Sequence, residues 1–273
     1  MKTRVTITLD DNLLKNLDEL TRREGYNSRS FMIEKIIRDS VSRRTKKTAL
    51  VLAGGVGSRL RPLTYETPKP MITIRGKPIL EYVVNALKSA GIEDIIISIS
   101  YLGEKIKSHF GNGDSFGVKI KYVEEKKALG TGGAIKNCES MIHDDVFVLN
   151  GDNLFDFDLS KMYEAHNKNR PFATIALTSR EKTSSFGVVN IDGDKITSFV
   201  EKPKTEQSSH LINAGIYILS PKFISMLPEG ESRVESMFEK LAPKGVINGF
   251  VYSGKWLPCD SIELYDKAIK NWP

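Results

Sequence analysis

The stretch LVLAGGVGSRLRPLTYETPKPM, from Leu50 to Met71, joins a short apolar run to a glycine turn and three basic side chains. The run ALVLA is typical of a buried parallel strand, and the glycines after it predict a loop at its carboxyl end. Glycines let backbone N–H groups approach a phosphate or a base without side-chain hindrance. Ligands of open α/β sheets bind at such strand ends. The stretch therefore predicts an α/β fold with a ligand site directly after this strand.

The glycine loop holds its cations on a stiff backbone. Pro62 follows Arg59, Pro68 and Pro70 stand on either side of Lys69, and proline restricts the chain. The loop lacks the Gly-Lys-Ser/Thr ending of a P-loop and the spacing of a dinucleotide fingerprint. A rigid loop with two cations and several free N–H groups suits a nucleoside triphosphate.

Composition excludes several classes of protein. The 273 residues are enough for one medium domain and a small one, and no apolar run reaches membrane-spanning length. The first fifteen residues lack the hydrophobic centre of a signal peptide. Cys138 and Cys259 form no Cys-x-x-Cys pair, and the four histidines show no metal-ligand spacing. We expect a cytoplasmic protein without a disulfide framework.

The positive charge is concentrated at the front of the chain. Residues 1–47 carry twelve Lys and Arg against seven Asp and Glu, whereas the remaining residues carry twenty-eight against twenty-seven. Any polyanionic partner is therefore expected at the front end.

Residues 1–43 show the pattern of one strand followed by two helices. Lys2–Asp10 alternates polar and apolar residues with a period of two, which is typical of a half-buried strand. Asp10 or Asp11 is expected to cap a helix with a leucine stripe, and a second amphipathic helix follows Asn27. A unit of this size cannot bury its apolar faces alone. We expect two copies to pair their strands as an antiparallel ribbon, giving a homodimer or a higher oligomer.

The motifs VTITLD, DNLLKNLDELTRREG and GYNSRSFMIEKII make this module resemble the ribbon–helix–helix family of DNA-binding repressors. The resemblance implies that the paired strands enter the major groove and that Arg4, Thr6 and Thr8 touch base edges. The N–H groups at the start of the second helix, Asn27 to Ser30, would meet a phosphate. The alternative is a dimerisation handle whose polar strand face is only solvated.

The loop LAGGVGSRLRPLT…PKPM, with motifs that follow in order, is similar to the signature of the sugar-1-phosphate nucleotidylyltransferases, also called NDP-sugar pyrophosphorylases. The resemblance covers residues 48–265. It implies a doubly wound, mostly parallel, Rossmann-like sheet in residues 49–273, after a basic linker at residues 44–48. Arg59 and Lys69 would neutralise the triphosphate. The resemblance assigns the nucleotide to Leu52, Ala53, Gly54, Gly55, Gly57 and Ser58, and to Glu125, Gly130 and Gly133 around a second glycine loop, ALGTGGAI.

Two carboxylates are the candidate metal ligands. The run VFVLNGD places Asp152 at the carboxyl end of a buried strand, and in the resembled family this Asp binds Mg²⁺. The closing motif GKWLPCDSIELYDKA supplies Asp260 as the second ligand. A hairpin turn at Asn150-Gly151 and a helix cap at Asp260 are the structural alternatives.

The sugar end is implied by the motifs ITSFVEKPK and INAGIYIL. In the resembled family the Glu of the first motif holds sugar hydroxyls and its Lys meets the sugar phosphate, so Glu201 and Lys202 take these roles. A charged hairpin edge is the alternative. The remaining sugar-side residues are Gly151, Asn213 and Gly215.

The reaction implied is attack by a sugar-1-phosphate oxygen on the α-phosphorus of a nucleoside triphosphate, with release of pyrophosphate. Glu125 stands where thymidylyl and uridylyl relatives often carry Gln. A carboxylate only accepts hydrogen bonds, and guanine offers two adjacent donors, which favours GTP and a mannose- or heptose-type sugar 1-phosphate. A solvated strand end at Glu124 and Glu125 would leave the base open. The alternatives are a glucose-1-phosphate thymidylyl-, uridylyl- or cytidylyltransferase, or a DNA-binding regulator that senses nucleotide sugars.

Overall fold

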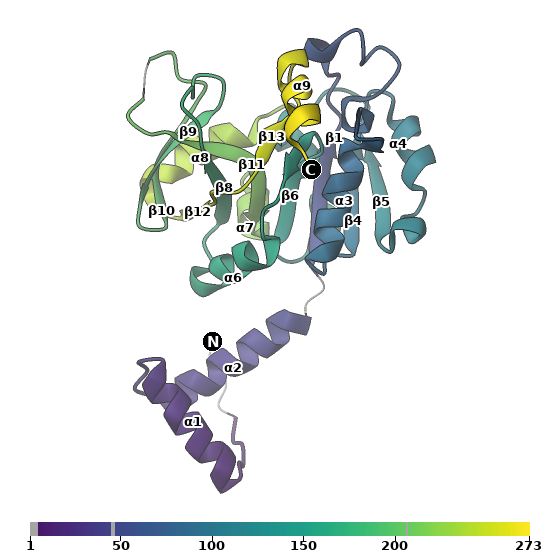
Figure 1. Cartoon of the computed structure of the whole chain (residues 1–273). Coiled ribbons are helices and arrows are strands. Elements are labelled where there is room, and N and C mark those ends of the chain that lie inside the picture. Colours follow the sequence, from purple (N-terminus) through teal and green to yellow (C-terminus); the bar gives the residue numbers. More distant parts are fainter. Residues whose placement is uncertain (1–4, 45–46, 206) are drawn as a thin grey trace. The chain divides into compact units, whose positions relative to one another are not determined.

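The structure is a computed structural model that describes residues 5–44, 47–205 and 207–273. The chain divides into two compact units, Met1–Lys46 and Lys47–Pro273. Figure 1 shows the two units, with most of their helices and strands labelled.

Two helices make up most of the described part of the first unit. They are α1 (Asp11–Arg23) and α2 (Arg29–Arg44). As predicted, Asp10 caps α1, because its side chain accepts the N–H of Leu13 at 2.8 Å. Leu17, in the leucine stripe, is buried.

The described part of the predicted front strand does not form a strand in the single chain. Residues 5–10 belong to no sheet. Residues 1–4, which include the predicted DNA contact Arg4, lie outside the described residues. A strand needs a hydrogen-bonding partner, and the rest of the described unit is almost entirely helical. Val5 and Ile7 consequently remain 77% and 48% exposed.

A nine-stranded sheet runs through the second unit in the order β5-β4-β1-β6-β11-β8-β12-β10-β9 (Figure 1). Its first four strands are parallel, as predicted. Strand β11 runs antiparallel to β6 and β8, whereas β12 runs parallel to β8, so the second half of the sheet is mixed. The strands are β1 (Thr48–Ala53), β4 (Asp94–Ile99), β5 (Lys119–Glu124), β6 (Val146–Asn150), β8 (Ala173–Ser179), β9 (Gly187–Asp192), β10 (Lys195–Glu201), β11 (Leu211–Leu219) and β12 (Ile247–Val251).

Helices cover both faces of this sheet, which is the doubly wound arrangement. Alternate residues of β1 face opposite cores: Ala49 and Val51 lie in one, and Leu50 lies in the other. The first core includes residues of α3, α4 and α6, and the second includes residues of α5, α7 and α8. These helices are α3 (Ile79–Ser89), α4 (Gly103–Phe110), α5 (Gly130–Asn137), α6 (Leu159–Asn169), α7 (Pro221–Ser225) and α8 (Val234–Leu241).

Two short ribbons and a last helix complete the second unit. A third core joins the loop after β1 to the C-terminal helix, since it contains Leu60, Ile74 and Trp272. The hydroxyl of Tyr265 also donates to the carbonyl of Thr73 at 2.8 Å. These elements are the ribbon β2 (Thr73–Ile74) with β3 (Lys77–Pro78), the ribbon β7 (Asn153–Phe155) with β13 (Trp256–Pro258), and α9 (Ile262–Asn271).

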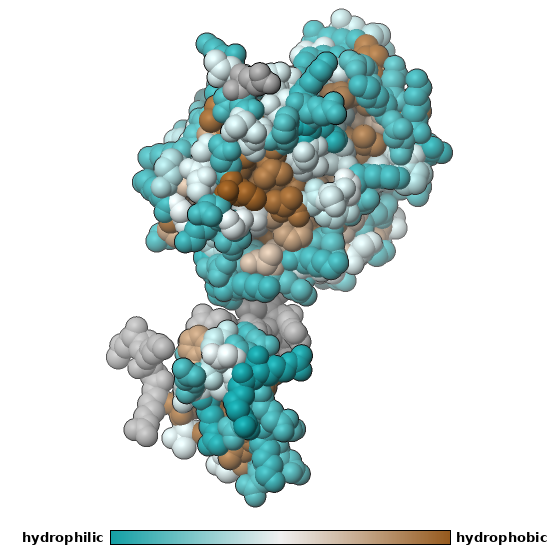
Figure 2. All heavy atoms as spheres, turned by 60° about the vertical axis from the view of Figure 1, so that its left-hand side comes forward, coloured by the Kyte–Doolittle hydropathy of each residue, from teal (hydrophilic) through white to brown (hydrophobic). Residues whose placement is uncertain are grey.

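Most of the second unit's surface that is visible in Figure 2 is hydrophilic or intermediate in hydropathy. Figure 2 brings the sheet edge with β9 and β10 forward and shows a cluster of apolar side chains on that face. Two valines near this end of the sheet are exposed, Val200 in β10 and Val251 in β12. None of the helices in the described ranges is long and apolar enough to span a lipid bilayer.

Candidate functional site

The loop after β1 folds back on itself and buries its lysine. The hydroxyl of Thr64 donates to the carbonyl of Gly57 at 2.8 Å. Gly57 has φ +66°, and a Cβ there would lie 2.9 Å from Thr64 and 3.0 Å from Cβ of Lys69. Glycine is therefore required at this turn. Lys69 is 8% exposed, although lysine is rarely buried without a partner.

The ammonium group of Lys69 bridges the two predicted metal ligands. Its Nζ lies 2.5 Å from Oδ2 of Asp152 and also donates to Oδ1 of Asp260. Arg59 approaches the same oxygen of Asp260 at 3.7 Å. Four predicted site residues from three distant segments thus meet at one point.

The ribbon of β7 and β13 brings the two carboxylates together. Pro258 is paired with Asn153, so Asp152 and Asp260 lie just beyond the paired residues, at the same end of the ribbon. The N–H of Cys259 donates to the carbonyl of Asp152 at 3.3 Å and extends this pairing. The predicted hairpin alternative at Asn150-Gly151 is wrong, because β7 pairs with β13 and not with β6.

The helix-capping alternative for Asp260 is also wrong. Ser261 is the N-cap of α9, and its hydroxyl accepts the N–H of Leu264 at 3.3 Å. The side chain of Asp260 is therefore directed to Lys69, and not to the first turn of α9.

Burial and charge compete at this centre, and charge prevails. Burial lowers the pKa of Lys69, but Asp152 and Asp260 outweigh it, so that the pKa is raised. Burial raises the pKa of Asp260, but Lys69, then Arg59 and Lys202, hold it below its usual value. The lysine is a stable cation and Asp260 a stable anion near neutral pH.

The donor set fits a divalent ion that is shared with substrate. Asp152 and Asp260 both reach one nitrogen atom, so their oxygens are close enough to bind one ion. In the described ranges there is no group of three or more His, Cys, Asp or Glu side chains that could hold a metal by itself. Magnesium is commonly held by one or two carboxylates together with substrate phosphates.

The side chain of Glu125 is partly buried and held by hydrogen bonds, and is not a solvated strand end. Ser98 donates to its Oε1 at 2.9 Å, and the N–H of Leu129 donates to its Oε2 at 3.2 Å. A Cβ on Gly54 would lie 2.8 Å from the same Oε1. Gly54 therefore has to be glycine for the carboxylate to sit beside the first loop. Glu124, in contrast, is exposed and pairs with Lys107 at 3.4 Å.

The second glycine loop is packed against the segment before α8. A Cβ at Gly130 would collide with the carbonyl of Ser232, and one at Gly133 with that of Gly230. The N–H groups of Gly132 and Gly133 donate to the carbonyl of Ser232 at 2.9 and 3.3 Å. The carbonyl of Ser232 thus satisfies N–H groups that a phosphate would otherwise bind.

The predicted sugar-side residues of the two motifs lie at the end of β10 and in the first half of β11. Lys202 has φ +46°, and its Nζ lies 3.4 Å from Oε1 of Glu201. Burial, followed by the charge of Glu235, raises the pKa of Glu201. Asn213 accepts the N–H of Gly215 at 2.9 Å within an irregularity of β11.

Gly215 and Gly151 allow close backbone approaches at this end of the site. A Cβ on Gly215, which has φ +72°, would lie 2.5 Å from the side-chain amide of Asn150. A Cβ on Gly151 would lie 3.1 Å from the carbonyl of Leu52. That carbonyl also accepts the N–H of Gly151 at 2.9 Å. Gly151, one of the predicted sugar-side residues, is therefore in direct contact with the end of β1, just before the first loop.

For the other predicted residues within the described ranges, the structure shows burial or exposure, but no contact that tests their predicted roles. Ala53 is buried at the end of β1, whereas Gly55 and Ser58 are exposed in the loop. A Cβ on Gly55 would meet no atom within 4 Å. The predicted DNA contacts Thr6 and Thr8 are exposed.

Sequence reasoning missed several residues that shape the site. Ser98 is fully buried in β4 beside Glu125. Gly187 lies at the start of β9, where a Cβ would meet the ring of Phe199 and, at 2.9 Å, Oε2 of Glu201. A serine inside an otherwise apolar strand was the one available signal for Ser98.

Comparisons with known proteins identify the family. Residues 48–257 match the sequence model of the nucleotidyl transferases. The second unit belongs to the nucleotidyl transferase family. Residues 3–44 match the model of ribbon-helix-helix proteins of the copG family.

Individual relatives agree with this assignment. The chain is 37% identical over 244 residues to UTP–glucose-1-phosphate uridylyltransferase of Synechocystis, covering 82% of this chain and 62% of the relative. It is 42% identical over 173 residues to D-glycero-alpha-D-manno-heptose 1-phosphate guanylyltransferase of Campylobacter jejuni, covering 63% and 75%. The chain thus spans less than two thirds of the Synechocystis relative.

A solved structure shows the same fold. HddC from Yersinia pseudotuberculosis, complexed with GMP-PN, superposes with a TM-score of 0.70 at 32% identity, covering 83% of this chain and all of HddC.

Proposed function

We propose that the second unit of this nucleotidyl transferase joins a sugar 1-phosphate to a nucleoside triphosphate and releases pyrophosphate. The observation that carries the proposal is the meeting of Lys69, Asp152 and Asp260 at the carboxyl edge of the sheet. A lysine and two carboxylates beside a glycine loop match the needs of a reaction between two phosphates.

Charge neutralisation is the main task of the site, because both substrates are anions. Arg59 is 67% exposed at its side chain, beside Asp260, and is free to meet the triphosphate. Lys202 also contributes to lowering the pKa of Asp260, so its charge is felt at the centre from the sugar side. The two cations would draw the triphosphate and the sugar phosphate toward the same point. The attacking phosphate oxygen is already ionised, so a general base is not needed.

Asp152 and Asp260 would hold Mg²⁺. When bound, such an ion stabilises negative charge on phosphate oxygens. Lys69 would then release one or both carboxylates and turn its ammonium group to the triphosphate.

The base is proposed to be guanine. Ser98 and the N–H of Leu129 each donate to one oxygen of Glu125, so the carboxylate is fixed while each oxygen keeps a lone pair. Two outward lone pairs match the adjacent N1–H and N2–H₂ of guanine. The named guanylyltransferase of Campylobacter jejuni supports this choice and a mannose- or heptose-type sugar.

The first unit is proposed to pair two copies of the chain. Val5 and Ile7 are exposed in a segment whose described backbone, residues 5–10, has no strand partner, and the ribbon-helix-helix match extends over them. A second copy supplies both the missing strand and an apolar cover. A cytoplasmic location, where nucleoside triphosphates are available, is part of the same proposal.

DNA binding is the second candidate activity of the first unit, because Thr6 and Thr8 are exposed on the polar side of that segment. Arg29, however, is bound to Asp18 through two hydrogen bonds of 2.6 and 2.7 Å, so its charge is already used. Fluorescence anisotropy with promoter and random DNA at two salt concentrations tests this activity, since phosphate contacts give a steep salt dependence.

The experiment that tests the enzymatic proposal is a matrix of nucleoside triphosphates against sugar 1-phosphates, assayed for pyrophosphate release with Mg²⁺ and with EDTA. We expect release with GTP and a mannose- or heptose-type sugar 1-phosphate, and none with EDTA. Absence of release in every combination would favour a regulator that only senses nucleotide sugars.

A further inference from the structure

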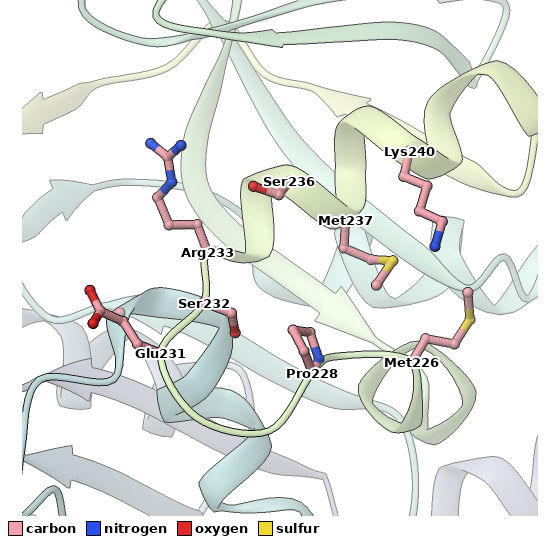
Figure 3. A pocket seen from close by; sticks show the side chains of 9 residues that line it. Met226, Pro228, Glu231, Ser232, Arg233, Ser236, Met237 and Lys240 are labelled. Carbon is pink, nitrogen blue, oxygen red and sulfur yellow. The ribbon is translucent and has the colours of Figure 1, made fainter.

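Helix α8 lies between the second glycine loop, at the nucleoside end of the site, and Glu201, at the sugar end. It begins after the segment 228–233, which Figure 3 shows leading into the turn that carries Ser236 and Met237. This turn borders a groove of about 650 Å³ that also includes Gly130 of the second glycine loop. The helix is fixed by Phe238, whose ring centroid lies 5.1 Å from that of Tyr217 and 5.5 Å from that of Phe199.

The first turn of α8 is bonded to the first turn of α5. The hydroxyl of Thr131 donates to Oε2 of Glu235 at 2.8 Å and accepts the N–H of Val234 at 3.0 Å. Thr131 thus uses its donor and one acceptor on α8. Because Gly130 and Gly133 leave no room for a Cβ against the segment before α8, the two helices approach closely, and this geometry fixes the glycine loop.

One turn later, the same helix is bonded to the sugar side. Oε1 of Glu239 accepts the backbone N–H of Glu201 at 2.9 Å. Residues four apart on a helix share a face, so Glu235 and Glu239 project in similar directions. Glu235 reaches the second glycine loop, and Glu239 reaches the backbone of Glu201, the residue predicted to bind the sugar. The charge of Glu235 is also felt at Glu201, whose pKa it helps to raise after burial.

We propose that Glu235 and Glu239 are positioning residues, Glu235 for the nucleoside end of the site and Glu239 for the sugar end. The inference rests on the proposed nucleotidyl transfer. Neither carboxylate needs to touch a substrate. Helix α8 sets the distance between the two ends, because Glu235 and Glu239 lie on consecutive turns of this one helix.

The test is a pair of binding titrations on the full-length protein, with the non-reacting analogue α,β-methylene-GTP and with mannose 1-phosphate. Glu235→Met should raise the Kd of the nucleotide by about tenfold and that of the sugar phosphate much less, as expected for loss of one charge-assisted hydrogen bond. Glu239→Met should raise the Kd of the sugar phosphate by roughly threefold and that of the nucleotide less, because its hydrogen bond is solvent-exposed. Thr131→Val should reproduce the effect of Glu235→Met, and Thr131→Ser should restore binding.

Glu231→Gln, an exposed carboxylate just before α8, is the matched control and should leave both Kd values within twofold. Thermal unfolding separates general damage from positioning, since damage would weaken both ligands alike. If Glu235→Met does not fold, Thr131→Val and Thr131→Ser decide for the nucleoside end. Equal shifts in both Kd values, or none, would overturn the inference while leaving the proposed function intact. A wild-type protein that binds neither ligand would overturn both.

Discussion

The ammonium nitrogen of Lys69 lies 2.5 Å from Oδ2 of Asp152 and occupies the space between this carboxylate and that of Asp260. The lysine is therefore the internal counter-ion of the two carboxylates. Any divalent ion that binds both Asp152 and Asp260 has to compete with it.

Lys69→Met should have opposite effects on catalysis and on the affinity for a divalent ion. Pyrophosphate release should fall by about two to three orders of magnitude, because a fixed cation at the triphosphate is lost. The affinity for Mn²⁺ without nucleotide should rise, because the ammonium group no longer competes for the carboxylates. Electron paramagnetic resonance of free Mn²⁺ measures this directly.

The matched control for Lys69 is Lys136→Met. The side chain of Lys136 is 10% exposed, as is that of Lys69, but it pairs with Glu139 at 2.7 Å, away from Asp152 and Asp260. Its Mn²⁺ affinity should equal that of the wild type. An unchanged Mn²⁺ affinity in Lys69→Met would show that the lysine does not compete with the ion for the two carboxylates.

Gly54→Ala should displace Glu125. The added Cβ would lie 2.8 Å from Oε1 of Glu125 and 3.2 Å from Cβ of Ser100, and overpacking of this kind costs about 1–3 kcal/mol. We expect a lower free energy of unfolding and weaker nucleotide binding. Gly55→Ala, one residue later, adds a Cβ in open space and should unfold at the wild-type denaturant concentration. Equal midpoints for the two variants in urea would contradict the packing at Gly54.

Glu125→Gln should change the preferred base. The amide oxygen would accept the N–H of Leu129, and the amide nitrogen would donate to Ser98, which leaves one donor and one acceptor facing the ligand. That pattern matches uracil or thymine and leaves one guanine donor without an acceptor. We expect the ratio of kcat/KM for GTP over UTP to fall by roughly 100-fold.

The comparison for Glu125→Gln is Glu124→Gln, the exposed neighbour whose ratio should stay at the wild-type value. If both variants keep the wild-type ratio, the base is read elsewhere.

The acid side of the pH profile should depend on Glu201. Its carboxylate accepts hydrogen bonds from sugar hydroxyls more strongly when it is ionised, and its pKa is raised by burial first and by Glu235 second. Lys202 and Arg233 act in the opposite direction, and the nearby Glu239 bonds the backbone N–H. Because the pKa is raised, kcat/KM for the sugar phosphate should decline at a higher pH than an ordinary glutamate would give.

Glu235→Gln removes one of the two causes that raise the pKa of Glu201. The decline should therefore move to lower pH in this variant. The ionisation of the sugar phosphate itself cancels in a comparison with the wild type on the same substrate. A midpoint that stays, or rises, would exclude Glu235 as a charge acting on Glu201.

The sequence predicted those parts of the site that depend on neighbouring residues in the chain, namely the loops at the carboxyl ends of the strands. An apolar run before Gly54 and another before Asp152 each indicated a ligand at the carboxyl edge, and the structure places both there. The bridge between Lys69 and Asp260 could not be predicted from local pattern, because 191 residues separate them. The packing of Ser232 on the second glycine loop was missed for the same reason. Glycine patterns look alike whether they admit a phosphate or a neighbouring backbone.

Ile7→Asp should split the proposed dimer. Ile7 is 48% exposed in the single chain, and its burial against a second copy would contribute roughly 2 kcal/mol per chain. A carboxylate there would be buried without a counter-charge, so we expect a monomer by sedimentation velocity. Thr6→Asp places the same carboxylate on the polar side of the segment and should remain a dimer. Turnover per chain should be equal in Ile7→Asp and the wild type, because Lys69, Asp152 and Asp260 all lie within the second unit. A dimeric Ile7→Asp would mean that the chains, if paired, pair through another surface.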